Sequence, residues 1–185
     1  MSTRIVKPAA IALLALAGIG GAAEAQRAGR PAPVQVTRVH LENTVTPAPT
    51  DVEARARGEV SPADMTQYQN AVAAQLVRIK FRPATADGGA AYVATVDVLR
   101  GDRAGVLRRV GPLTGVRAAD SPSQNAGQQA VLLSVQLQRR ADGSVVWEGR
   151  AIGPARGDAA ATARRLSAAL FRGFPGASGQ TIAVR

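Results

Sequence analysis

The segment AVLLSVQLQRRADGSVVWEGRA, residues 130–151, decides the fold of this chain of 185 residues. Its first half alternates apolar residues with mostly polar ones, which is the period of a strand that buries one face. The apolar positions of this phase are Val131, Leu133, Val135 and Leu137. Asp142-Gly143 is a turn signal, and Val145 and Trp147 share one face of the returning segment. The segment therefore predicts a β-hairpin.

An amphipathic helix is predicted between residues 61 and 82. Ser61 can cap its free amides, and Pro62 suits the first helical position. The apolar residues that follow recur at spacings of three and four, so they share one face of the helix. These residues are Met65, Tyr68, Val72, Leu76 and Ile79. Pro83 requires the helix to end before it.

A second helix is predicted near the end of the chain. Asp158 can cap its first turn, and the helix runs to about Arg172, where Gly173 and Pro175 stop it. Three apolar residues at helical spacing supply its inner face. These are Ala163, Leu166 and Leu170.

Two further segments, Val34–Leu41 and Ala91–Leu99, are rich in β-branched residues and are predicted as strands. In the first, the apolar residues change phase between Val36 and Val39, which a bulge or a strand covered on both faces would explain. Residues 44–58 are predicted as a connection. Residues 100–129 are predicted as a long loop with several Gly and Pro, in which Val106–Val110 is a candidate short strand.

The order of elements is β-α-β-β-β-α, with the long loop after the second strand. Two amphipathic helices need one apolar surface to cover, and a single mixed sheet supplies it. We therefore expect an α+β domain, a two-layer sandwich of one mixed sheet of about four strands with two helices on one face. If the two strands of the β-α-β unit are parallel, their crossover is right-handed.

The N-terminus has the parts of a secretory signal. Arg4 and Lys7 precede an uncharged apolar run over residues 9–19, and Ala23-Glu24-Ala25 fits a cleavage site. The run is shorter than the roughly 20 residues of a membrane-spanning helix. We expect residues 1–25 to be a signal peptide, rather than an uncleaved anchor or a core helix. This predicts a periplasmic protein with a flexible leader over 26–33, one domain over 34–176 and a C-terminal tail over 177–185.

The hairpin and the last helix resemble a known family. Val146-Trp147-Glu148-Gly149 closes the hairpin, and Phe174-Pro175 follows the last helix. A strand ending in Val-Trp-x-Gly and a helix closing with Phe-Pro are similar to domain-of-unknown-function family forty-one thirty-six. The resemblance implies a bacterial envelope protein and supplies no reaction or site. Many relatives look lipid-anchored, whereas this chain has no cysteine and is expected not to be a lipoprotein.

The chain carries a formal net charge of +10, of which residues 26–185 carry +9 because Arg4, Lys7 and Glu24 account for the rest. Such a balance can indicate an anionic partner, although arginine also follows from GC-rich codons. Arginines gather in the predicted long loop, where their guanidinium groups could bind phosphate or carboxylate. They are Arg100, Arg103, Arg108, Arg109 and Arg117, of which the last four are the candidate binding residues. A solvated loop is the alternative.

Other candidates for chemistry are sparse. His40 is the single histidine, and no nucleophile elbow, phosphate loop or cysteine-based metal site is present. Asp97 lies within a predicted strand and Asp102 in the predicted loop, so a pair of carboxylates could serve hydrolysis only if the fold brought them together. Trp147 is expected in the core rather than as a stacking platform. We expect no metal, no cofactor and no nucleic-acid partner.

Three functions remain open after these observations. The first is a non-enzymatic periplasmic module that binds a protein or another component of the envelope. The second is binding of polyanions, such as lipopolysaccharide or anionic lipid, through the arginine-rich loop. The third is a periplasmic hydrolase that works through carboxylates, with Asp97 or Asp102 involved.

Overall fold

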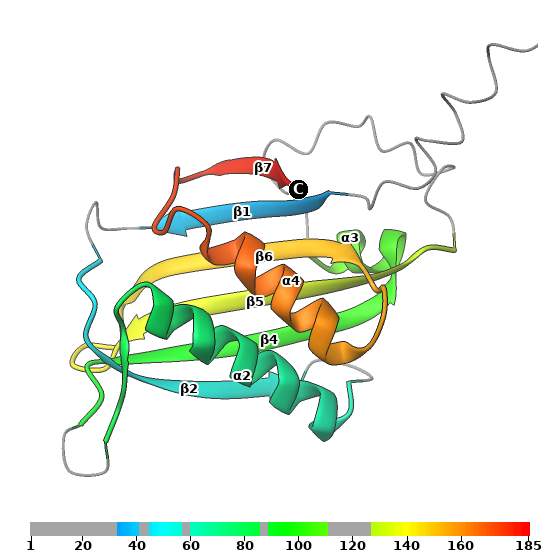
Figure 1. The fold of residues 1–185 in the computed structure, drawn as a ribbon. Helices are drawn as coiled ribbons and strands as arrows, with labels where there is room; N and C mark the ends of the chain where they lie inside the picture. Colours follow the sequence, from blue (N-terminus) through cyan, green and yellow to red (C-terminus); the bar gives the residue numbers. More distant parts are fainter. Residues whose placement is uncertain (1–32, 41–44, 57–59, 86–88, 111–126) are drawn as a thin grey trace, which may run out of the picture. The chain divides into compact units, whose positions relative to one another are not determined.

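The computed structural model describes residues 33–40, 45–56, 60–85, 89–110 and 127–185. These residues form one mixed sheet of seven strands in the order β3-β2-β4-β5-β6-β1-β7 (Figure 1). The strands are β1 (Val34–His40), β2 (Pro49–Ala56), β3 (Arg82–Pro83), β4 (Tyr92–Asp102), β5 (Gln129–Arg139), β6 (Val145–Pro154) and β7 (Gln180–Val184). The helices are α2 (Pro62–Arg78), α3 (Arg103–Val110) and α4 (Ala159–Phe171). None of these helices is long and apolar enough to cross a membrane.

The sheet corrects the expected fold, which had about four strands. Strand β2 lies inside the predicted connection over 44–58, and β7 lies inside the predicted tail over 177–185. Strand β2 does alternate polar and apolar residues, but two of its three apolar positions, Ala54 and Ala56, are alanines, which favour strands only weakly, and β7 has five residues. Both strands lie at or near an edge of the sheet, where Glu53, Arg55 and Ile182 are exposed. Strand β3 has two residues, both exposed, and pairs with the start of β2.

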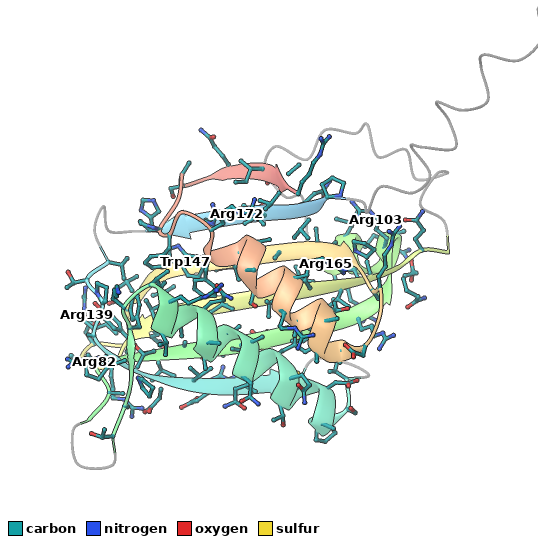
Figure 2. All side chains as sticks on the ribbon, viewed as in Figure 1. Arg82, Arg103, Arg139, Trp147, Arg165 and Arg172 are labelled. Carbon is teal, nitrogen blue, oxygen red and sulfur yellow. The ribbon has the colours of Figure 1, made fainter. Side chains whose placement is uncertain are left out.

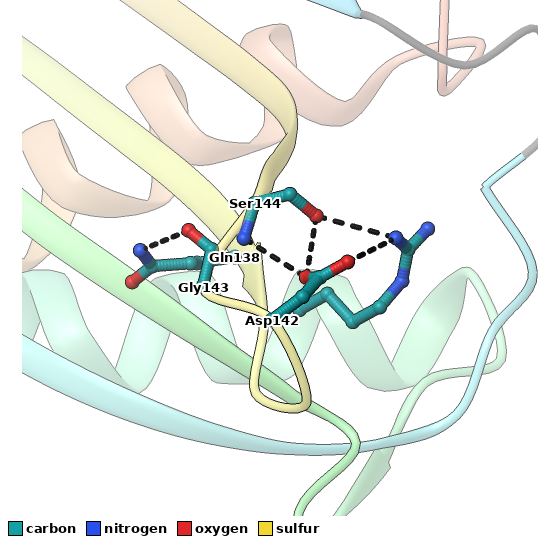
Figure 3. A network of polar contacts seen from close by, with 5 residues as sticks. Gln138, Asp142, Gly143 and Ser144 are labelled. Carbon is teal, nitrogen blue, oxygen red and sulfur yellow. Dashed lines mark hydrogen bonds and ion pairs between the residues drawn. The ribbon is translucent and has the colours of Figure 1, made fainter.

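The predicted hairpin is present at the centre of the sheet. Strand β5 pairs antiparallel with β6, and Leu137 lies opposite Trp147. In the turn, the Asp142 carboxylate accepts hydrogen bonds from the Ser144 amide at 3.0 Å and the Ser144 hydroxyl at 2.7 Å (Figure 3). Arg139 donates to the other carboxylate oxygen at 3.0 Å. Gly143 takes a φ of 71°, a conformation that favours glycine, as the Asp-Gly signal predicted.

Helices α2 and α4 lie side by side on one face of the sheet, as expected (Figure 1). Both begin at the predicted caps: Ser61 Oγ accepts from the Asp64 amide at 3.1 Å, and Asp158 Oδ1 accepts from the Ala161 amide at 2.6 Å. The main core lies between these helices and the sheet. It includes the inward phase of β5 and the inner faces of both helices.

The β-α-β unit differs from the expected one. Helix α2 connects β2 to β4, and these two strands pair in parallel. Strand β1, which we expected to be the first strand of the unit, pairs antiparallel with β6 and β7 instead. The difference follows from the missed strand β2, which lies between β1 and α2 in the chain.

The opposite face of the sheet carries a second, smaller core. Val106 of α3 packs with Ala130, Leu132 and Ile152, which point away from α2 and α4. The first residues of the predicted loop over 100–129 therefore belong to regular elements: β4 extends to Asp102, and Val106–Val110 is helix rather than strand. Residues 111–126 lie outside the described residues. Covering Leu132 and Ile152 is the physical reason for a helix here.

Candidate functional site

Three exposed arginines line a pocket where β4 meets α3. The end of β4 and part of α3 border a pocket of about 530 Å³. Among the described residues, its lining combines three arginines, one carboxylate, two glycines and one apolar side chain. These residues are Arg100, Gly101, Asp102, Gly105, Val106, Arg108 and Arg109. We name this the arginine pocket, and its three arginines are exposed to solvent.

Asp102 lines the arginine pocket and caps the helix beside it. It precedes the first residue of α3, and its Oδ1 accepts a hydrogen bond from the Gly105 amide at 2.8 Å, which is the contact of a helix cap. Gly105 leaves room for this contact, because a Cβ there would lie 2.6 Å from Asp102 Oδ2. Val106, 2% exposed, anchors α3 on the sheet. The cap and the anchor together hold Arg108 and Arg109 at the pocket.

The positive charge of the arginine pocket is not neutralised within the described part of the chain. Arg100, Arg108 and Arg109 take part in no ion pair there, and Asp102 is the one described carboxylate of the lining. Guanidinium groups that lack carboxylate partners keep their planar sets of N–H donors for a ligand. The arrangement is therefore suited to an anion.

The positive charge of Arg100 also acts on Tyr68 of α2. Burial raises the pKa of Tyr68 on α2, whereas the charges of Arg100 and Arg165 lower it and that of Asp64 raises it. Burial and the nearby charge of Arg156 lower the pKa of the Arg165 guanidinium. Positive charges from β4 and α4 are therefore both felt at Tyr68.

The predicted binding residues do not all reach the arginine pocket. Arg108 and Arg109 line it, as does Arg100 from the same arginine group. Arg103 is 7% exposed and does not line it, although it lies at the same end of the sheet (Figure 2). Its amide donates to the Gln128 carbonyl at 2.9 Å, which fixes the start of α3 beside β5. Arg117 lies outside the described residues.

The candidate carboxylates do not converge. Asp97 and Asp102 are five positions apart on β4, and side chains alternate along a strand, so the two project to opposite faces of the sheet. Asp97 lies opposite Arg55 of β2 and Ser134 of β5. Within the described ranges no group of three or more His, Asp or Glu could hold a metal ion. The geometry therefore does not favour the hydrolase hypothesis.

His40 lies on β1, away from the arginine pocket. Its Nε2 is 3.2 Å from the Gly176 carbonyl, and its amide donates to Ser178 Oγ at 3.1 Å. These contacts join the end of β1 to the segment before β7, so the geometry gives His40 a role in holding the C-terminal segment.

Trp147 is a core residue, as predicted. It is 1% exposed and stacks on Phe171 with ring centroids 5.4 Å apart, beneath the end of α4 (Figure 2). Its Nε1 donates to the Pro175 carbonyl at 3.1 Å, and Phe174 lies 5.2 Å from its ring. The residues of the Val-Trp-x-Gly and Phe-Pro motifs thus lie together in the structure, in a contact for which the sequence carries no local signal.

No known protein family and no curated protein matches the sequence. Among solved structures, the PelC dodecamer from Paraburkholderia phytofirmans is similar at 16% identity over 73% of this chain and 92% of that chain, with a TM-score of 0.45. A variant of it reaches 17% identity and a TM-score of 0.47. A PDZ domain protein from Parabacteroides distasonis is 12% identical over 87% of this chain and 41% of that chain, with a TM-score of 0.47. Any function must therefore be argued from the residues of this chain.

Proposed function

We propose that this chain is a non-enzymatic binding module of the bacterial envelope, and that the arginine pocket takes an anionic component of that envelope. One observation carries the proposal: three exposed arginines line one pocket, and its single described carboxylate accepts a hydrogen bond as a helix cap. Guanidinium groups bind phosphate and carboxylate through paired N–H donors. The proposal joins the first two functions that the sequence left open and sets aside the hydrolase.

The location in the periplasm is part of the same proposal. It is supported by the charged start, the apolar run over residues 9–19 and the Ala23-Glu24-Ala25 site. The resemblance of residues 130–176 to the envelope family points the same way. Mass spectrometry of the protein from its own cells tests it, because cleavage gives the mass of residues 26–185. The uncleaved mass would contradict export as a processed protein.

Binding of purified lipopolysaccharide tests the proposed ligand class. The pocket variant replaces Arg100, Arg108 and Arg109 by Gln. We expect it to bind at least tenfold more weakly than the unmodified chain at low salt. Its affinity should also depend less on salt, because fewer ionic contacts are screened.

A matched control distinguishes the effect of the arginine pocket on affinity from the effect of net charge. It replaces three exposed arginines elsewhere, Arg55, Arg78 and Arg164, by Gln and so removes the same charge. The control variant should keep most of the affinity. Equal losses in the two variants, or no loss in either, would contradict binding at the pocket.

A further inference from the structure

We infer that the group bound in the arginine pocket is a phosphate monoester rather than a carboxylate. The inference rests on the proposed function, namely that this pocket binds an anion. Its first ground is charge. Three guanidinium groups and one carboxylate leave the described lining with an excess of two positive charges. A phosphate monoester near neutral pH carries close to two negative charges, whereas a carboxylate carries one.

The second ground is the direction of the donors. Arg100 belongs to β4, whereas Arg108 and Arg109 belong to the last turn of α3, so the arginines that line the pocket come from two separate elements. A carboxylate has two oxygens in one plane, and a single guanidinium fork can occupy both. A phosphate monoester has three terminal oxygens in a tetrahedral arrangement. It can therefore accept hydrogen bonds from several guanidinium groups at once.

The third ground is the size of the pocket and its small lining residues. About 530 Å³ is within the range of small-molecule sites and exceeds what one phosphate group needs. Gly101 and Gly105 contribute no side chain, and Val106 supplies an apolar contact. The remaining space suits the organic part of the ester. The ester could be a soluble sugar or glycerol phosphate, or a phosphate monoester on a lipid.

Calorimetric titration of the full chain tests the chemical class. The probes are glycerol 3-phosphate, glucuronate and inorganic sulfate, each at pH 5 and pH 7.5. We expect glycerol 3-phosphate to bind at least tenfold more tightly than glucuronate at pH 7.5. Its affinity should rise severalfold from pH 5 to pH 7.5, because its second proton leaves near pH 6.

Sulfate controls for titration of the protein. It stays a dianion over this range, and so its affinity reports on the protein groups at the pocket, namely Arg100, Arg108, Arg109 and Asp102. We expect it to change little, since guanidinium groups stay charged. Asp102→Asn keeps the cap and removes the negative charge, and it should tighten binding of glycerol 3-phosphate severalfold.

The outcomes separate this inference from the proposed function. Glucuronate binding as tightly as glycerol 3-phosphate, with both lost in the pocket variant, would overturn the phosphate inference and leave an anion site. Binding of every probe unchanged in the pocket variant would overturn the proposed function itself. Vesicles of phosphatidylcholine with phosphatidic acid give the source. If the protein stays on the vesicles and glycerol 3-phosphate competes with them for it, the ligand is a lipid phosphate. If the protein binds glycerol 3-phosphate but not the vesicles, the ligand is a soluble phosphate.

Discussion

The indole ring of Trp147 covers Gly149, two positions further along the same strand. A Cβ on Gly149 would lie 2.3 Å from Trp147 Cη2 and 2.7 Å from Leu170 Cδ1. The ring is held on its other sides by Phe171 and by the Pro175 carbonyl, so it cannot move away freely. Glycine at position 149 is therefore a condition for packing Trp147 under α4.

Gly149→Ala should therefore destabilise the fold by roughly 1–3 kcal/mol through overpacking. Urea denaturation followed by tryptophan fluorescence measures the change, because Trp147 is the single tryptophan. Gly101→Ala is the matched control, since the nearest atom to its Cβ is 3.7 Å away. Equal stability of the two variants would show that the indole can shift.

Arg38→Met should destabilise the protein by about 3 kcal/mol, because it leaves carbonyl groups at the end of α4 without their donors. Arg38 is 4% exposed, and its Nε donates to the Leu170 carbonyl at 2.8 Å. Its Nη2 donates to the Ala169 and Arg172 carbonyls at 3.0 and 2.9 Å. These carbonyls belong to the last turn and the C-cap of α4, where the helix supplies no amide partner. Thermal unfolding measures the loss.

Arg38→Lys tests whether charge alone serves at the end of α4. Lysine keeps the charge but lacks the planar fork, so it should recover only part of the lost stability. Arg55→Met, at an exposed position on β2, controls for the loss of one arginine. Full recovery by lysine would mean that the helix dipole, and not the hydrogen bonds, accounts for the effect.

Asp102→Ala should loosen α3 by about 1 kcal/mol, the usual cost of losing a helix cap. Amide hydrogen exchange at Gly105 and Val106 reports on this helix locally. Asp102→Asn should preserve the protection, because asparagine caps as well as aspartate does. Similar exchange in the two variants would contradict the capping role.

Asp142, in the turn between β5 and β6, should titrate at an unusually low pH. Hydrogen bonds from Ser144 and from Arg139 lower the pKa of Asp142 from 3.8 to about 2. A carboxyl whose folded pKa lies below its unfolded value stabilises the fold above pH 3.8, and this contribution is lost as the pH falls toward 2. The carboxyl carbon of Asp142 should titrate with a midpoint near 2 in NMR spectra, and a midpoint near 3.8 would contradict the network.

Stability measured between pH 4 and pH 2 gives a second check on the same turn. The unmodified chain should lose stability across this window relative to Asp142→Asn, which has no proton to take up at this position. The expected difference is small because Asp142 is exposed. Parallel curves for the two chains would argue against the shift.

The sequence predicted the hairpin and the two long helices because each has a strong local period. It did not predict β2 and β7, because the alternation in β2 rests mostly on alanines, which favour strands weakly, and β7 has only five residues. The change of phase within β1 arises from a contact that one of its residues makes outside the strand. Arg38 continues the inward phase of Val34 and Val36, whereas Val39 is 45% exposed. An arginine that binds a helix end 132 positions away leaves no local signal.

The sequence showed that arginines gather in this part of the chain, but not which of them line the pocket. The arginines of 100–109 stood out by composition, yet sequence could not separate Arg103, which is buried, from Arg108 and Arg109, which face the pocket. That distinction depends on α3, an eight-residue helix that Asp102 starts and that Val106 attaches to the far face of the sheet.

Strand β1 lies between β6 and β7, although both follow it by most of the chain (Figure 1). The hydroxyl groups of Thr37 and Thr181 are 2.6 Å apart across β1 and β7 and 144 positions apart in the chain. Joining segments so distant costs much loop entropy, which makes such pairing slow. On a ribosome, β1 emerges well before either neighbour exists. The sheet around β1 is therefore completed only after synthesis has passed Val184.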